Sequence, residues 1–263
     1  MPAELNHLRR GAGEPLVLIH GIGSRWQVWL PVLDALAAQR DVIAIDLPGF
    51  GFSPAPVGVP AGAKSLSRLV AAFLDELGLA RPHVAGNSLG GWVALELART
   101  GRAASATGLS PAGFHSHAEG VFLNLSLRFV RAAARFARPD AARLCQSATV
   151  RRLAFAQLAA HPERIPPFEA AETLLGLADA TWFDETRRAL VAERFHSGQS
   201  LGVPVTIAWG EHDRLLLPRQ AARAAREIPD ARMVTLMGCG HVPTYDDPPQ
   251  VAQVLLAGSA GAG

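Results

Sequence analysis

The chain has 263 residues, of which 49% are hydrophobic and 18% charged, and its formal net charge is +2 at pH 7. This length suits one large α/β domain, or a core domain with an insertion. The nearly balanced charge does not predict a polyanionic partner, so no nucleic acid is expected. No apolar run reaches the roughly 20 residues that cross a bilayer, so no membrane span is expected either.

The two cysteines and the N-terminus bear on location. Residues 1–10 lack the apolar stretch of a signal peptide. Cys145 and Cys239 lie far apart and outside any Cys/His cluster, so no metal site is expected. These features favour a reduced, cytoplasmic setting. The oligomeric state is left open, with a homodimer as one alternative.

Strand and helix patterns alternate through the first 110 residues. A weak edge strand is expected at 4–9, and Ser65 is expected to cap a helix that Gly78 closes. The other expected strands are 15–19, 41–45, 82–85 and 103–109, and the other expected helices are 29–38 and 92–99. This alternation predicts an α/β fold, a mostly parallel sheet with helices on both faces.

The alternation stops at Ser110. From about 119 to 195 only helical patterns occur, a stretch too long for a simple crossover. We therefore expect a helical cap at 114–197, inserted between core segments 1–113 and 198–263. Arginines recur there at helical spacing, which predicts a solvated basic face, whereas Phe122 and Phe129 are expected in the core. The core rhythm resumes with strands at 203–209 and 231–236 and helices at 218–227 and 249–256.

One short motif organises the chain. The sequence Gly86-x-Ser88-x-Gly90 stands between the strand at 82–85 and the helix at 92–99. Such a junction is too tight for ordinary side chains, so the glycines make room and the serine hydroxyl is held exposed on a strained turn. The helix that follows directs its first N–H groups at an anion formed there. The motif therefore predicts a nucleophile at Ser88.

Two further loops follow strands and reach the same edge of the sheet. Asp213 follows the strand ending at Trp209, and His241 follows the strand ending at Leu236. A serine hydroxyl becomes a nucleophile when an imidazole takes its proton, and a buried carboxylate orients that imidazole. The tetrahedral oxyanion then needs N–H donors, each contributing roughly 3 kcal/mol. We expect these donors to be the backbone N–H groups of Ile22 and Leu89.

The complete set of motifs resembles the α/β-hydrolase superfamily over the whole chain. The motifs are His20-Gly-Ile-Gly23, Asp46-Leu-Pro-Gly-Phe-Gly-x-Ser53, Gly86-Asn-Ser-Leu-Gly-Gly91, Gly210-x-x-Asp213 and Gly240-His241. The chain is similar to capped carboxylesterases and to carbon–carbon bond hydrolases of aromatic ring-fission products. The resemblance implies a triad of Ser88, Asp213 and His241, no cofactor, and a sheet of about seven to eight strands. Haloalkane dehalogenases and epoxide hydrolases of this superfamily carry Asp at the nucleophile position, so Ser88 points to acyl transfer.

Several neighbours of these motifs have other expected roles. Glu211 is the rival acid, but the family pattern favours Asp213. His20 and Gly21 are expected to order the oxyanion loop, and His115 and His117 to lie at the surface. Candidates for substrate contact are Gly23 and Val242. Phe114 and Trp182 are expected in the core, with a place in the substrate pocket as the alternative. The residues expected only to pack or to form turns are Cys239 and Asp46.

The expected function is therefore a serine hydrolase acting on a small acyl substrate such as an ester. A carbon–carbon bond hydrolase is the first alternative, although only Arg25 and Arg214 are candidates for holding the carboxylate of a ring-fission product. A ligand-binding protein that keeps the fold without turnover is the second alternative.

Overall fold

The computed structural model describes residues 5–260. One sheet of seven strands stands at its centre, in the order β1-β3-β2-β4-β5-β6-β7. β1 runs antiparallel to β3, and every other neighbouring pair is parallel. The strands are β1 (His7–Gly11), β2 (Pro15–Ile19), β3 (Asp41–Ile45), β4 (His83–Asn87), β5 (Ser105–Leu109), β6 (Val205–Gly210) and β7 (Arg232–Leu236). The α/β fold expected from the sequence is thus confirmed.

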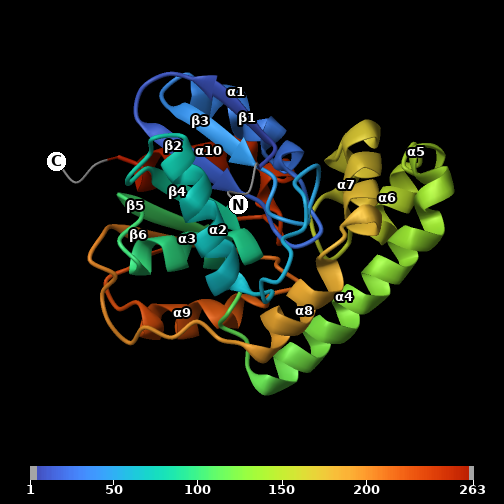
Figure 1. The fold of residues 1–263 in the computed structure, drawn as a ribbon. Coiled ribbons are helices and arrows are strands. Elements are labelled where there is room, and N and C mark those ends of the chain that lie inside the picture. Colours follow the sequence, from blue (N-terminus) through green and yellow to red (C-terminus); the bar gives the residue numbers. More distant parts are fainter. Residues whose placement is uncertain (1–4, 261–263) are drawn as a thin grey trace.

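Ten α-helices accompany the sheet within the described residues (Figure 1). They are α1 (Leu30–Ala37), α2 (Ala63–Glu76), α3 (Leu89–Arg99), α4 (His117–Ala137), α5 (Ala141–Leu144), α6 (Ala148–Ala154), α7 (Pro167–Asp179), α8 (Phe183–Ala192), α9 (Ala221–Glu227) and α10 (Pro248–Gly258). None of them is both long enough and apolar enough to span a membrane.

The strands are buried on both faces because alternate side chains enter two separate cores. In β2, Val17 and Ile19 pack with residues of α2, α3 and α9, whereas Leu16 and Leu18 pack with residues of α1 and α10. Each fully buried Leu or Ile side chain contributes roughly 1.5–3 kcal/mol to folding. This double burial explains the continuous apolar runs in the sequence, and it fixes the carboxyl ends of the strands as a rigid platform.

Several element boundaries differ from expectation, among them the starts of α3, β5 and β6. β1 begins at His7, two residues after the described part of the chain starts, and position 4 of the expected edge strand lies outside that part. α2 begins at Ala63 with Gly62 as its N-cap, so the prediction of a Ser65 cap is wrong. The φ of Gly62 is +139°, a backbone conformation that glycine adopts readily, and the helix starts directly after it.

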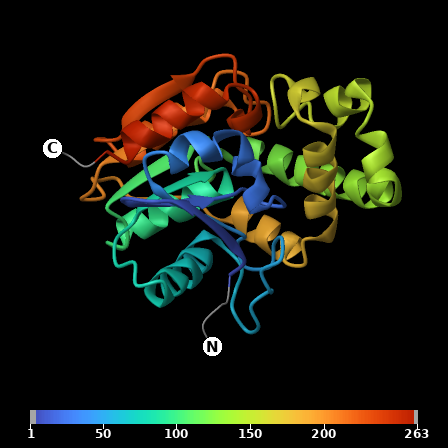
Figure 2. The ribbon, with the colours of Figure 1, turned by 90° about the horizontal axis from the view of Figure 1, so that it is seen from above.

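Helices α4 to α8 all lie between β5 and β6 in the chain and gather at one end of the molecule (Figures 1 and 2). We call them the 117–192 helices. α4, the longest, packs against α7 and α8 and forms the lower outer edge of this group in Figure 1. Residues 155–161, the loop after α6, reach back to the core: Leu158 O accepts a hydrogen bond from Val242 N at 2.6 Å.

The expected polarity of α4 is correct for Arg128 and Arg135, which are exposed, but wrong for Arg131 and for two phenylalanines. Arg131 is buried, and its guanidinium donates to the carbonyls of Leu177 and Ala180 at the C-terminal end of α7. Phe122 and Phe129, expected in the core, are 40% and 74% exposed. The physical reason is that the last carbonyls of a helix lack intrahelical partners, and a guanidinium satisfies them better than an aromatic ring.

Candidate active site

Ser88 stands on a strained turn between β4 and α3. Its φ is +56° and its ψ is −117°, a conformation costly for a residue with a Cβ. Ser88 N donates to Leu109 O at 3.0 Å, and Ser88 O accepts from Ala112 N at 2.9 Å, so the neighbouring β5 loop holds the turn in place. Over-determination of this kind is what allows a strained turn to persist.

The glycines of the motif are required by close backbone contacts. A Cβ on Gly86 would lie 2.2 Å from the carbonyl carbon of Gly90, and a Cβ on Gly90 would lie 2.1 Å from Ile19 O. A Cβ on Gly21 would lie 3.2 Å from the Ser88 Cβ, so the loop after β2 passes directly beside the candidate nucleophile. The sequence motif therefore encodes a three-way approach of β2, β4 and α3.

Asp213 and His241 form a buried pair. His241 Nδ1 lies 2.7 Å from Asp213 Oδ2, and their side chains are 3% and 0% exposed. The other carboxylate oxygen, Oδ1, accepts from Leu215 N at 2.9 Å and Leu216 N at 2.8 Å. Because an ionised carboxylate only accepts, Nδ1 carries the proton and Nε2 of the neutral imidazole keeps its lone pair.

The loop that carries His241 is fixed from three sides. The backbone carbonyl of His241 accepts a hydrogen bond from Asn87 Nδ2 at 2.8 Å, which ties the loop to the residue before Ser88. Asp246 accepts from Gly240 N at 2.8 Å and also from His161 N at 2.7 Å, linking the same loop to the loop after α6. The sequence analysis did not predict that Asn87 and Asp246 hold this loop. The available signal was their position: Asn87 directly precedes the candidate serine, and Asp246 follows the candidate histidine by five residues.

Two further residues from the sequence analysis, His20 and Asp46, lie near the loop after β2. His20 is fully buried; its Nδ1 donates to Gly21 O and its Nε2 accepts from Leu47 N at 2.9 Å. Burial lowers the pKa of His20, so the ring stays neutral and can do both. Asp46 accepts from Trp26 N and Phe52 N, which matches its expected role in a turn.

Rival groups are excluded by exposure or chemistry. Glu211 is 39% exposed and accepts from Gly238 N, away from the imidazole. Cys239 is buried, which raises the pKa of its thiol to about 12 and keeps it protonated at neutral pH. Among the described residues, no group of three or more His, Cys, Asp or Glu side chains is placed to hold a metal ion.

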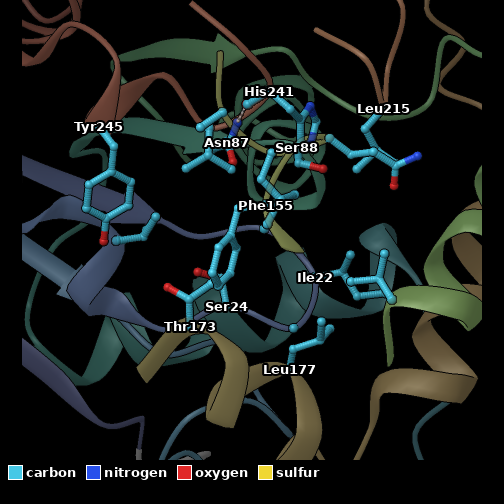
Figure 3. Close-up of a pocket in the computed structure, with 18 of the residues that line it drawn as sticks. Ile22, Ser24, Asn87, Ser88, Phe155, Thr173, Leu177, Leu215, His241 and Tyr245 are labelled. Atoms are coloured by element: carbon cyan, nitrogen blue, oxygen red, sulfur yellow. Dashed lines mark hydrogen bonds between the residues drawn. The ribbon is translucent and has the colours of Figure 1, made fainter. Parts of the chain in front are cut away.

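A cavity joins these parts (Figure 3). Ser88, His241, Ile22, Gly23 and Val242 all line it, and most of the remaining wall is apolar. The 117–192 helices and the loops between them supply Leu127, Val130, Ala154, Phe155, Gln157, Leu158, Ala159, Ile165, Thr173 and Leu177. Three hydroxyl-bearing side chains, Ser24, Thr173 and Tyr245, also line the wall and separate it from a second, smaller cavity that they share.

Two residues considered for substrate contact do not line the cavity. Phe114 packs against Phe195, with ring centroids 5.6 Å apart. Trp182 packs over Gly49, whose added Cβ would lie 2.3 Å from the Trp182 Cβ. His115, expected at the surface, is buried beside Val191 O, whereas His117 is exposed as expected. His115 and Trp182 join α8 to the core, and Phe114 packs in the core outside the 117–192 helices; periodicity cannot reveal these contacts.

The family model described as "Alpha/beta hydrolase family" matches residues 16–254. The chain belongs to the alpha/beta hydrolase family. As a member of that family, with hydrolases among its relatives, it is a hydrolase.

Two relatives show how wide the family is. This alpha/beta hydrolase is 36% identical over 249 residues to the dihydrolipoyllysine-residue acetyltransferase component of an acetoin cleaving system of Pseudomonas putida. That match covers 93% of this chain but 63% of the relative, so the chain spans less than two thirds of that protein. The chain is also 33% identical over 192 residues to the epoxide hydrolase EphH of Mycobacterium tuberculosis. That match covers 70% of this chain and 88% of the relative.

Among solved structures, the hydrolase resembles an enol-lactonase from Burkholderia xenovorans with a TM-score of 0.76. The identity is 22%, and the match covers 97% of this chain and 96% of the other. At this identity the likeness concerns the fold alone.

Proposed function

We propose that this hydrolase cleaves esters, or closely related acyl compounds, through a covalent acyl-enzyme on Ser88. The observation that carries the proposal is the buried His241–Asp213 contact of 2.7 Å, which opens onto the same cavity as a serine held at φ +56°. A hydroxyl, an oriented neutral imidazole and a fixed carboxylate in one cavity are the parts that nucleophilic acyl transfer needs.

The proposed reaction has two halves. His241 Nε2 takes the proton of Ser88 as Oγ attacks the substrate carbonyl, and the backbone N–H groups of Ile22 and Leu89 receive the oxyanion. The imidazolium, stabilised by Asp213, then gives its proton to the departing alcohol. Water, deprotonated by the same imidazole, attacks the acyl-enzyme and releases the acid and the free serine.

The wall of the cavity supports an apolar substrate of modest size. We propose that the 117–192 helices act as the cap of this site, within the segment 114–197, because Leu127 and Val130 of α4 and Leu177 of α7 supply part of its wall. Thr173 and Tyr245 offer hydroxyl groups to a polar atom of the substrate. A water-excluding wall strengthens the electrostatic interactions within the site.

The competing reactions are less well supported. Cleavage of a ring-fission product needs a cation for the substrate carboxylate, but no Arg or Lys stands among the described residues that line the cavity. Arg25 is paired with Glu172 at 2.9 Å, and Arg214 donates to Ala156 O. Epoxide opening by the route of the superfamily would need Asp in place of Ser88. The free thiols of Cys145 and Cys239 support the proposed cytoplasmic setting.

A panel of p-nitrophenyl esters of increasing acyl length tests the proposal. The wild-type protein should hydrolyse the short esters, and Ser88→Ala should abolish turnover. Ser24→Ala, a serine in the same cavity wall, is the matched control and should keep most of the activity. Undiminished turnover by Ser88→Ala would exclude the mechanism, and inertness of the wild-type protein towards every ester would favour the ligand-binding alternative.

A further inference from the structure

The outer face of α4 is apolar over most of its length. Phe122, Phe129 and Phe136 are 40%, 74% and 90% exposed, and Val121 and Leu125 are 48% and 57% exposed. Soluble proteins expose single apolar residues routinely, but a contiguous apolar patch of this kind marks an interaction surface. We call this set, with the exposed Ala118 and Ala132, the α4 outer stripe.

The spacing of the stripe is regular. Six of its seven members, at 118, 122, 125, 129, 132 and 136, are separated by alternating steps of four and three residues, which keeps them on one side of the helix, and Val121 lies beside them. The 21 residues of α4 extend over roughly 30 Å at 1.5 Å per residue. The stripe therefore follows the course of α4, which runs along the outer edge of the molecule in Figure 1.

The opposite face of the same helix is already occupied. Leu123 and Leu127 are buried, and Leu127 and Val130 line the cavity that holds Ser88. Arg131 is anchored to the end of α7. The inner contacts fix the rotation of α4, so the phenylalanines cannot turn inward without breaking them.

Within α4, the exposed charges beside the stripe have one sign. Arg128 and Arg135 are exposed and flank it, seven residues apart. Glu119 is the one acidic residue between 117 and 137, and it is buried beneath Arg219 and Arg223. Between 117 and 153 the sequence has seven arginines and two acidic residues. A partner that fits must therefore combine an apolar layer with negative charge.

We propose that the α4 outer stripe docks this protein on an anionic phospholipid surface. The phenylalanine rings and Leu125 would enter the boundary between headgroups and acyl chains, while Arg128 and Arg135 extend to the lipid phosphates. An apolar helix face flanked by basic residues is the signature of a helix lying in the plane of a membrane interface. Docking would bring the outer side of the cavity wall at Leu127 and Val130 against the lipid.

A second copy of this chain fits the stripe less well. Helices that pair along such a seam add opposite charges at its margins. The exposed margins here supply Arg128 and Arg135 on one side and Ala133 on the other. Two identical stripes would therefore bring no carboxylate to either guanidinium, whereas a lipid surface supplies a phosphate to each.

The test is cosedimentation of the whole protein with vesicles. The expected result is binding to phosphatidylcholine vesicles that contain phosphatidylglycerol, weaker binding to pure phosphatidylcholine, and loss of the difference at about 1 M salt. Phe129→Ser/Phe136→Ser should lower the partition coefficient roughly a hundredfold. Arg128→Gln/Arg135→Gln should lower it on the order of tenfold.

The matched control is Phe52→Ser/Phe168→Ser, which replaces two phenylalanines exposed to 70% and 73% outside α4. This control should bind like the wild-type protein. Light scattering gives the mass of each protein in solution. Failure of the wild-type protein to bind anionic vesicles, equal loss of binding in the control, or a dimer that Phe129→Ser/Phe136→Ser dissolves would overturn the proposal.

Discussion

The loops at the carboxyl edge of the sheet and the 117–192 helices differ in what fixes their side chains. At the edge, backbone contacts fix the side chains. Gly90 lies so close to Ile19 O that a Cβ would not fit, and Asp213 accepts hydrogen bonds from two N–H groups of its own loop. In α4, packing decides which face turns inward, and it buries Arg131 while Phe129 stays exposed. In the function proposed above, the chemistry of the site would rest on the first kind of constraint, and the selection of substrate on the second.

The largest effect is expected from the carboxylate at the edge. Asp213→Asn keeps an oxygen for the N–H groups of Leu215 and Leu216 but loses the charge that stabilises the imidazolium. We expect kcat to fall by about 10⁴ with little change in the melting temperature. Steady-state kinetics on a p-nitrophenyl ester measure it.

Glu211→Gln is the matched control for that variant, because Glu211 is two residues away and accepts from Gly238 N. It should retain nearly full activity. If Glu211→Gln lost as much as Asp213→Asn, the acid would have been assigned to the wrong residue.

The buried histidines should make the stability of the protein depend on pH. Burial lowers the pKa values of His20, His83 and His115 below the usual value of about 6.5. The unfolded chain therefore binds more protons as pH falls, so the stability that these neutral rings contribute is complete above pH 6.5 and is lost towards their folded pKa values. Urea unfolding should show this decline between pH 8 and pH 5, a range that spans the pKa of about 6.5 of a histidine in the unfolded chain.

A pair of variants tests how much of the loss of stability at low pH comes from His115. Protonated His115 would carry a second buried N–H at Nδ1, which has no partner among the described residues. His115→Gln should therefore flatten the pH dependence, whereas His117→Gln, at an exposed position, should leave it unchanged. Identical slopes for both variants would contradict the role given to burial.

The smallest effect is expected within the helices. Leu177 lines the cavity, and its Cδ1 lies 2.5 Å from a Cβ built on Gly23. Leu177→Ala should raise kcat/KM for a long acyl ester relative to a short one by roughly tenfold, because the extra methylenes gain room. Leu175→Ala, on the same helix but outside the cavity wall, should leave this ratio unchanged; an equal shift in both would place the acyl chain elsewhere.

The sequence predicted the sheet because its strands are continuous apolar runs, and it predicted the loops of Ser88, Asp213 and His241 because each directly follows a strand. It could not predict the polarity of α4. A helix with apolar residues all round has two faces that can be buried, and the decision came from the unpaired carbonyls of Leu177 and Ala180 on α7, far along the chain. The same applies to Phe114 and Trp182, which pack away from the cavity.

The most direct test of the central claim is to label the protein with a fluorophosphonate and locate the adduct by peptide mass spectrometry. The reagent phosphonylates a serine that has an activated hydroxyl. We expect one adduct on Ser88, no adduct in Ser88→Ala, and a rate of labelling that falls in parallel with kcat in Asp213→Asn. An unmodified Ser88 in a protein that still hydrolyses esters would contradict the account.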